Sequence, residues 1–429
     1  MPPVNQPLKQ SGYVNRKFDD DLDVLLKSFK IVEIEGVLGC GKTWTALAHA
    51  QSATTLGDTK MVLPIIQANP HIALTGVAPH LIDDWTNLPE LQELMYRESG
   101  RPGSYISVSS HIPQTEDIYV RRHAARGVKV RMRTCTIDEL GFSRRDVAWE
   151  DIVAGRFSPG STTLELERTA RLICSGGWPA GIGQEDEIAR QTAECCVEEA
   201  ILQVSTVFKK KVPTASAALT AIADGAGGDT NYPALTKRIE QLGAKPPSRT
   251  TLSTYLGILE RLCLIERVQG WDAPIRSKSR VRTKPRYFPV DCSVSTSMRQ
   301  LAANDLLGNA PLFQACLKSM VLHELLCRVD SPASKTPGRV CYYSDADGLE
   351  IDFILLFDDG SWAPINVELG EHQVTSSAKR IARLYNKLAS NEGSGIRPPA
   401  FSAIILGSAA KRSHEKISDS FVFPITDLY

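Results

Sequence analysis

The sequence predicts an α/β fold built on a parallel sheet, and three observations support this prediction. From residue 31 to about residue 135, apolar stretches with a strand pattern alternate with helical stretches, which is typical of a parallel sheet covered by helices. The first strand runs directly into a glycine-rich loop, which a helix follows. Polar residues stand at the ends of two later strands, where ligands gather in open α/β sheets.

The glycine-rich loop has the pattern of a phosphate-binding loop. Residues 36–43 read GVLGCGKT, which fits G-x-x-x-x-G-K-T. Its glycines let the backbone curl so that N–H groups point inward; Lys42 then reaches the β- and γ-phosphates and the Thr43 hydroxyl ligates magnesium. We therefore predict a site for ATP and Mg²⁺; the alternative is a glycine-rich turn between unrelated elements. The expected nucleotide contacts from the loop and the first helical turn are Gly36, Gly39, Cys40, Gly41, Lys42, Thr43 and Trp44.

Two later strands are expected to end beside this loop. Residues 80–85 read HLIDDW, and we interpret Asp83 as the Walker-B carboxylate that holds magnesium and Asp84 as the group that polarises the attacking water. Residues 105–110 read YISVSS, and Ser109, or else Ser110, is a candidate contact for the γ-phosphate. The alternatives are a solvated helix-capping pair of aspartates and a turn formed by serines.

Residues 121–133 are dense in Arg and Lys. One of these arginines, for which we favour Arg126, would act as an arginine finger on the γ-phosphate of a neighbouring subunit, because a transferring phosphoryl group needs a fixed cation. Alternation of Val128, Val130 and Met132 favours instead a strand with a solvated basic face. Both interpretations stay open at this point.

Composition limits the classes of protein to which the chain can belong. Its 429 residues are enough for two to four domains, and the 49 Lys and Arg residues balance the 49 Asp and Glu residues, so no global field attracts nucleic acid or anionic lipid. The N-terminus lacks the apolar core of a signal peptide, and no apolar run reaches membrane-spanning length. We therefore expect a cytoplasmic protein without a membrane partner.

The ten cysteines include no C-x-x-C pair, so we expect them to be reduced. We expect the side chain of Cys40, which lies within the phosphate loop, to point away from the nucleotide.

The second half of the chain predicts further domains. Residues 160–210 are helical in pattern, with a break at 175–180, and fit a lid. Residues 233–239 and 248–262 resemble a helix-turn-helix, and residues 264–268 resemble a wing strand. The second helix, which begins near Arg249, and the basic run at 276–286 would suit DNA, although winged helices also dock proteins. Three strands, a helix and a further strand follow between residues 340 and 407.

Taken together, the chain resembles prokaryotic AAA-type ATPases that carry a C-terminal restriction-endonuclease-like domain of unknown function. The matching segments are 34–45, 81–85, 130–133, 173–180, 255–262, 286–291 and 347–355. The resemblance implies an N-terminal segment (1–30), a P-loop ATPase core of the AAA type (31–155), a helical lid (156–212), a winged helix (213–290) and a nuclease-like domain (291–429).

Two departures from the family pattern modify what the resemblance implies. Family members usually show Asp-Glu-Trp where this chain has Asp83-Asp84-Trp85, so we expect slow hydrolysis. Nuclease-like tails use an Asp and then an acid-x-Lys to hold magnesium. Here Asp352 occupies the first place, but Asn366-Val367-Glu368 replaces the pair, and Lys318 replaces an upstream helical acid. We therefore predict that this domain does not cut DNA.

The sequence thus predicts an ATP-binding protein of the AAA class. We expect modest magnesium-dependent hydrolysis coupled to movement of the winged helix and the tail. The expected partners besides ATP are DNA or a protein at the winged helix and further copies of the chain. The alternatives are a DNA-associated regulator or defence protein in which ATP acts as a switch, and an active nuclease.

Overall fold

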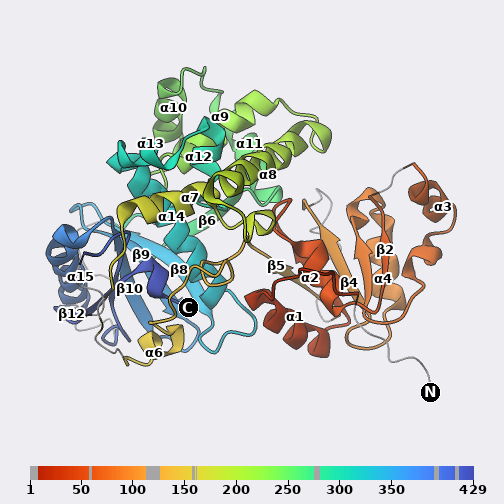
Figure 1. The fold of residues 1–429 in the computed structure, drawn as a ribbon, viewed down its shortest axis with the longest axis horizontal. Helices are drawn as coiled ribbons and strands as arrows, with labels where there is room; N and C mark the ends of the chain where they lie inside the picture. The colour runs from red at the N-terminus through yellow and green to blue at the C-terminus, as the bar shows by residue number, and fades with distance from the viewer. Residues whose placement is uncertain are drawn as a thin grey trace. The chain divides into compact units, whose positions relative to one another are not determined.

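The computed structural model describes residues 8–57, 60–112, 126–156, 160, 162–274, 281–390, 396–410 and 415–429. The chain divides into two compact units. Unit 1 comprises residues 1–134 and 261–263, and unit 2 comprises residues 135–260 and 264–429. None of the helices in the described part of the chain combines the length and hydropathy that a membrane crossing requires. Figure 1 shows the course of the chain.

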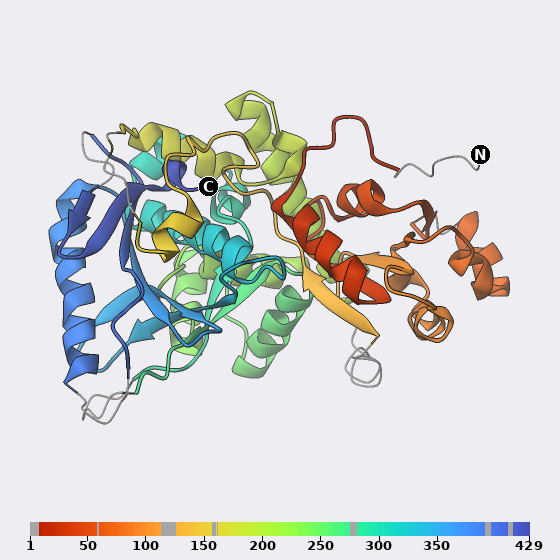
Figure 2. The same ribbon diagram turned by 90° about the horizontal axis from the view of Figure 1, so that it is seen from below.

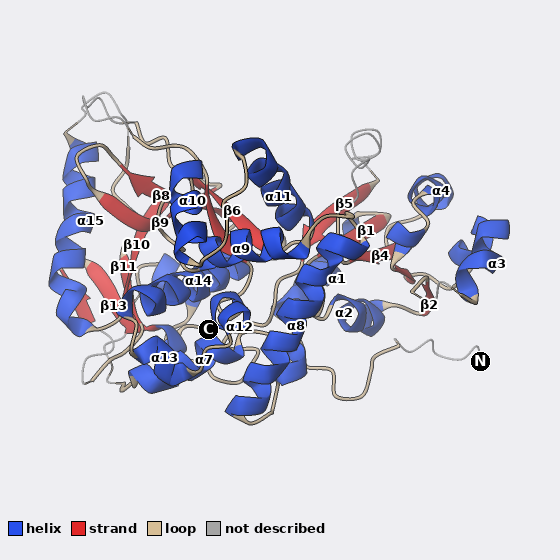
Figure 3. Cartoon of the chain, turned by 90° about the horizontal axis from the view of Figure 1, so that it is seen from above, coloured by secondary structure: helices blue, strands red, loops and turns tan. Residues whose placement is uncertain are grey.

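Unit 1 contains a five-stranded, fully parallel sheet with the strand order β2-β3-β4-β1-β5. Its strands are β1 (Ile31–Glu35), β2 (Ser52–Thr55), β3 (His80–Asp83), β4 (Tyr105–Ser109) and β5 (Gly127–Arg131). The α-helices among the described residues of this unit are α1 (Lys17–Ser28), α2 (Lys42–His49), α3 (Val62–Ala68) and α4 (Glu90–Glu98). Because all strands run in the same direction, their carboxyl ends meet at one edge of the sheet. This confirms the predicted α/β fold with a parallel sheet, and Figure 3 distinguishes its strands from its helices.

The central strand β1 explains how this sheet is stabilised. Ile31, Val32 and Ile34 are almost completely buried, as expected for a strand that helices cover on both faces. Ile31 belongs to an apolar core that also contains Ile82 of β3 and Met95 of α4. Strand β1 is therefore held in the core of unit 1 before the chain enters the phosphate loop.

Unit 2 contains an eight-stranded mixed sheet with the order β12-β13-β11-β10-β9-β8-β6-β7. Its strands are β6 (Ile265–Gly270), β7 (Arg286–Pro289), β8 (Gly338–Ser344), β9 (Glu350–Phe357), β10 (Trp362–Glu368), β11 (Ala403–Leu406), β12 (Glu415–Ile417) and β13 (Ser420–Pro424). Helix α14 (Ala310–Val329) packs with Leu355, and helix α15 (Val374–Ala389) packs with Ile354. Since neighbouring residues of a strand point to opposite faces, the two helices cover opposite faces of the sheet (Figure 2).

The other described helices of unit 2 lie around this sheet; in Figure 1 the first of them lies near the C-terminus and the rest gather above the sheet. They are α6 (Trp149–Val153), α7 (Leu166–Ser175), α8 (Asp186–Thr206), α9 (Val212–Ala223), α10 (Tyr232–Gln241), α11 (Arg249–Arg261), α12 (Val294–Arg299) and α13 (Ala303–Leu307). Helix α7 contacts α8 and α13, and α8 contacts α9 and α12. Residues predicted as a separate lid and winged helix thus pack into one unit with the tail.

Two predicted domain boundaries differ from this division. Residues 135–155, which the sequence assigned to the ATPase core, lie in unit 2, where the backbone N–H of Cys135 donates to Gly177 at 2.6 Å and Val147 bridges to Leu428. The strands β6 and β7, assigned to a winged helix, belong to the sheet of the tail, because β6 pairs with β8. Both boundaries differ because these segments pair with residues that are distant in the sequence. Such pairing leaves no local sequence pattern from which it could be predicted.

Candidate functional site

The phosphate loop lies between β1 and α2, and its glycines are required by its shape. Gly39 and Gly41 have φ angles of 86° and 101°, which side-chain-bearing residues rarely adopt. A Cβ atom at Gly36 would lie 2.3 Å from the carbonyl oxygen of Met132, so the backbone after β5 passes too close for any other residue. Gly39 and Gly41 are therefore required by their left-handed backbone conformation, and Gly36 is required because the backbone of Met132 lies so close to it.

Lys42 begins α2 and returns its side chain into the loop. Only 6% of Lys42 is exposed, and its Nζ donates to the carbonyl oxygens of Gly36 at 2.9 Å and Val37 at 2.8 Å. The backbone N–H groups of the first turn of α2 have no acceptor within the helix, and the helix dipole makes this end positive. The loop thus brings an ammonium group and free backbone donors together, which is the arrangement that a phosphate needs.

Thr43 and Asp83 supply oxygen atoms beside the loop. The Thr43 hydroxyl donates to Asp83 Oδ1 at 3.3 Å, and Asp83 is the last residue of β3. Burial, and then repulsion from Asp84, raises the pKa of Asp83 to about 6, while the hydrogen bond from Thr43 lowers it. A hydroxyl and a carboxylate are the hard oxygen ligands that magnesium prefers, so these two residues fit the predicted cation.

Asp84 follows directly and adopts an uncommon backbone conformation. Its φ angle is 55°, which Asp tolerates better than most residues, and its backbone N–H donates to Asp83 Oδ1 at 3.1 Å. Burial raises the pKa of the Asp84 carboxyl, and the charge of Lys42 opposes this shift. The structure therefore brings Lys42, Thr43, Asp83 and Asp84 to one place, and their roles toward ATP and Mg²⁺ stay a prediction.

Three other predicted contacts occupy different environments at this edge. Ser109 ends β4, and its buried Oγ has no hydrogen-bond partner among the described residues, so its contact with the γ-phosphate stays a prediction. Trp44 lies in the first turn of α2 and is 47% exposed. The Cys40 side chain is completely buried and donates to the Met132 carbonyl at 3.6 Å. Its Sγ also lies 3.8 Å from the Nζ of Lys42, so the expectation that this side chain points away from the nucleotide stays a prediction.

Arg126 is not part of this cluster within its own chain. It precedes β5, whose first residue pairs with Ile31, the first residue of β1. Arg126 thus lies at the amino edge of the sheet, opposite the phosphate loop, and its guanidinium donates to the Tyr96 carbonyl at 3.2 Å. Arg121, Arg122 and the other residues from 113 to 125 lie outside the described part of the chain. A role for Arg126 at the nucleotide of another subunit stays a prediction.

Strand β1 carries a buried polar group, Glu33, that was not predicted from the sequence. Glu33 is 1% exposed, accepts a hydrogen bond from Gln92 at 3.2 Å, and lies 3.7 Å from the Nζ of Lys129. The same ammonium lies 3.3 Å from Glu35. Burial raises the pKa of Glu33 to about 7; Lys129 opposes this rise and Glu35 adds to it. The alternating polar residues of IVEIE and GVKVR were the available signal.

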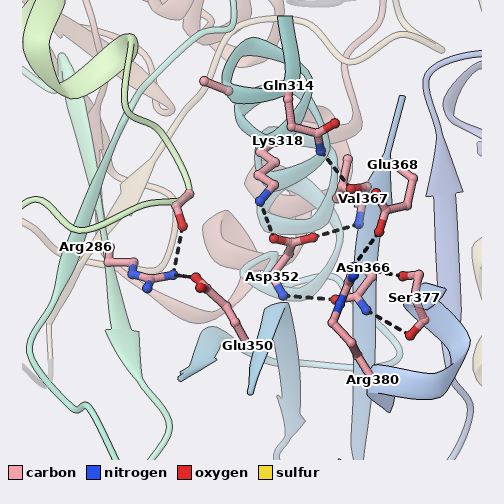
Figure 4. Close-up of polar contacts among 12 residues, drawn as sticks. Arg286, Gln314, Lys318, Glu350, Asp352, Asn366, Val367, Glu368, Ser377 and Arg380 are labelled. Carbon is pink, nitrogen blue, oxygen red and sulfur yellow. Dashed lines mark hydrogen bonds and ion pairs between the residues drawn. The ribbon is translucent and has the colours of Figure 1, made fainter. Parts of the chain in front are cut away.

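Unit 2 contains the second predicted site, where β9 and β10 lie beside α14 (Figure 4). The Lys318 Nζ lies 2.5 Å from Asp352 Oδ1, and the backbone N–H of Val367 donates to Asp352 Oδ2 at 2.9 Å. Asn366 accepts a hydrogen bond from the backbone N–H of Asp352 at 3.2 Å. Asp352, Lys318 and Asn366 therefore lie together beside α14.

The neighbouring carboxylates of this cluster also have cationic partners. Arg380 of α15 lies 2.5 Å from Glu368, and Arg286 pairs with Glu350. In the described part of the chain, no group of three or more His, Cys, Asp or Glu residues could hold a metal ion. The carboxylates of this cluster are therefore neutralised by Lys and Arg side chains from other elements.

The predicted helix-turn-helix corresponds to α10 and α11. Leu252, Tyr255 and Leu259 of α11 are buried, whereas Arg249 and Ser253 near its N-terminus are exposed. The exposed face of α11 also includes Thr250 and Thr254. The first part of the basic run 276–286, residues 276–280, lies outside the described residues.

Comparisons with known proteins identify relatives of unit 2 only as domains of unknown function. The family model DUF8612 matches residues 166–305, and the family model DUF4143 matches residues 314–426; each is described as a domain of unknown function. No curated protein matches the chain.

Several solved structures are similar to the chain. The Walker-type ATPase PABY2304 of Pyrococcus abyssi is 11% identical, with a TM-score of 0.42 over 69% of this chain and 99% of that chain. The ORC2 protein of Aeropyrum pernix, in ADPNP and ADP complexes, is 13% identical, with a TM-score of 0.32 over 74% of this chain and 97% of that chain. The ORC1 protein of Aeropyrum pernix in complex with DNA is 16% identical, with a TM-score of 0.24 over 68% of this chain and 94% of that chain. At these values the similarity carries no functional argument, and function follows from the residues of this chain.

Proposed function

We propose that the chain binds ATP with Mg²⁺ in unit 1 and hydrolyses it slowly. The observation that carries this proposal is the convergence of the buried Lys42 ammonium, the Thr43 hydroxyl and the Asp83 carboxylate at the mouth of one glycine loop. A triphosphate would take over the Lys42 donors from the two loop carbonyls and accept bonds from the first turn of α2. Magnesium, when bound, neutralises charge on the β- and γ-phosphates.

Hydrolysis requires a water molecule that is oriented toward the γ-phosphate. Asp84 is the proposed orienting group, because its carboxylate lies in the field of Lys42 and directly follows Asp83. Its side chain is one methylene shorter than the glutamate of the resembling family, so the distance to the water is less favourable and turnover is slow. Arg126 of a second subunit would stabilise the transferring phosphoryl group, which implies self-association of the chain with ATP.

Isothermal titration calorimetry with MgATP tests the nucleotide proposal. The wild type is expected to bind, and Lys42→Ala is expected to abolish binding. Lys30→Ala is the matched control, because Lys30 precedes β1 at the opposite edge of the sheet and donates to the Ser99 carbonyl at 3.5 Å. Absence of affinity in the wild type would refute the proposal. Mass measurement with and without ATP tests the expected self-association.

A second proposed function is DNA contact through α11, with ATP acting as the switch. The supporting observation is the exposed face of Arg249, Thr250, Ser253 and Thr254 at the N-terminal end of the second helix. In helix-turn-helix modules this end of the second helix contacts base edges and phosphates. A protein partner on the same face is the competing proposal, and gel retardation with DNA of mixed sequence distinguishes the two.

The C-terminal cluster supports the proposal that unit 2 does not cleave DNA. Lys318 neutralises Asp352, while the amide of Asn366 has no charge to contribute to a metal. Incubation of DNA with Mg²⁺ or Mn²⁺ is expected to leave it intact. Cleavage that Asp352→Ala abolishes would show that this proposal is wrong.

A further inference from the structure

Arg16 lies in the segment before α1 and contacts the phosphate loop from outside. Its side chain is buried, with 7% of the residue exposed. Its Nη1 donates to the carbonyl oxygen of Cys40 at 2.9 Å, and its Nη2 donates to the carbonyl oxygen of Arg133 at 2.9 Å. One planar guanidinium thus joins the loop to the segment that follows β5.

The contact with Cys40 determines the direction of the next amide. In a trans peptide, the carbonyl of one residue and the N–H of the following residue point to opposite sides of the chain. Since the Cys40 carbonyl points to Arg16, the N–H of Gly41 points away from Arg16, toward the inner side of the loop. Gly39 and Gly41 flank Cys40 and have few steric limits of their own, so the contact from Arg16 adds a restraint on this peptide to the backbone bonds of Cys40 and Gly41.

The segment that carries Arg16 is itself fixed to α1 and α2. The Tyr13 hydroxyl donates to Asp19 at 2.6 Å, and its oxygen lies 3.0 Å from the Thr45 hydroxyl of α2. Asp19 also lies 3.1 Å from the Nε2 of His49, and it accepts a hydrogen bond from the backbone N–H of Arg16 at 2.8 Å. These contacts fix the backbone before and after Arg16, which restricts the positions that its guanidinium can take.

We propose that Arg16 is a positioning residue of the nucleotide site: it fixes the Cys40–Gly41 peptide so that the Gly41 N–H faces the phosphates. This inference rests on the proposed function in unit 1. Without Arg16 the peptide can rotate and present the Cys40 carbonyl to the triphosphate, which replaces an attraction by a repulsion. Arg16 contacts no phosphate in this arrangement and acts only through the loop.

The first test follows the loop itself and needs no nucleotide. Hydrogen exchange, measured by mass spectrometry on peptides that cover residues 36–44, is expected to accelerate in Arg16→Lys, because one ammonium cannot span both carbonyls. Lys30→Ala serves as the control and is expected to leave this exchange unchanged. Equal exchange in Arg16→Lys and the wild type would overturn the proposal, whether or not the protein binds ATP.

The second test measures affinity for MgATP by calorimetry. Arg16→Lys is expected to weaken binding by about tenfold, the effect of one charge-assisted hydrogen bond. In Arg16→Ala, millimolar guanidinium is expected to restore affinity because it refills the vacated space, whereas in Lys42→Ala it is expected to restore nothing. A loss that guanidinium does not rescue in a folded Arg16→Ala protein, or wild-type affinity in Arg16→Lys, would contradict the proposal. Failure of the wild type to bind ATP would instead refute the proposed function, and the exchange measurement would still decide the role of Arg16.

Discussion

The ion pair between Lys318 and Asp352 leads to a quantitative prediction for unit 2. The pair is short, at 2.5 Å, and the exposed fractions of the two side chains are 20% and 8%. Removal of one partner from a buried pair costs about 3–5 kcal/mol, because the other charge is left without compensation. Asp352 keeps the hydrogen bond from the Val367 N–H, and Lys318 is partly exposed, so Lys318→Met is expected to lie at the lower end, about 3 kcal/mol.

Hydrogen exchange of the amides in β9 and β10 reports the opening free energy of this unit within the full chain. Lys318→Met is expected to lower it, and Lys318→Met combined with Asp352→Asn is expected to recover most of the loss. Lys335→Met is the matched control, since Lys335 is exposed. A loss below about 1 kcal/mol, which is typical of exposed pairs, or strictly additive effects of the two substitutions would refute this reasoning.

Three further predictions concern other parts of the chain. Burial is the main cause that raises the pKa of Glu33 from 4.5 to about 7, so the folded protein holds a proton there that the unfolded chain loses. The free energy of unfolding of the wild type should therefore fall as the pH rises from 4.5 to 7, by about 3 kcal/mol at most. Glu33→Gln should remove this loss; an unchanged pH slope in urea unfolding would contradict the burial argument. Asp84→Glu should increase the steady-state release of phosphate severalfold, since it restores the missing methylene, and an unchanged or lower rate would argue against Asp84 as the water-orienting group. Arg249→Ala should weaken DNA retardation and reduce its salt dependence while ATP hydrolysis is unchanged; equal retardation by the variant would remove α11 from the proposed interface.

The predictable part of the molecule consists of local patterns. The strand IVEIE and the loop GVLGCGKT are contiguous, so their geometry follows from neighbouring residues, and the parallel sheet follows from the alternation around them. Asp83 was found because an apolar strand ends there. In unit 2, the resemblance aligned Asp352 and Lys318 with two acidic positions of the nuclease-like pattern. The structure shows these two side chains in contact.

The remaining features depend on contacts between distant segments. Strand β2, with the sequence SATT, is short and half exposed, and only its pairing with β3 makes it a strand. The position of Arg126 at the amino edge follows from the register of β5 against β1, which composition does not reveal. Arg16 lies 24 residues before Cys40, and nothing in its surrounding sequence marks it as a partner of the loop.

The central proposal is that the phosphate loop of unit 1 binds the triphosphate of ATP. Calorimetric titration of the full chain with MgATP, carried out in parallel on Lys42→Ala, measures this property. We predict one bound nucleotide per chain in the wild type and no measurable binding in Lys42→Ala. A wild type that binds no ATP, or a Lys42→Ala variant that binds it with unchanged affinity, would contradict the account.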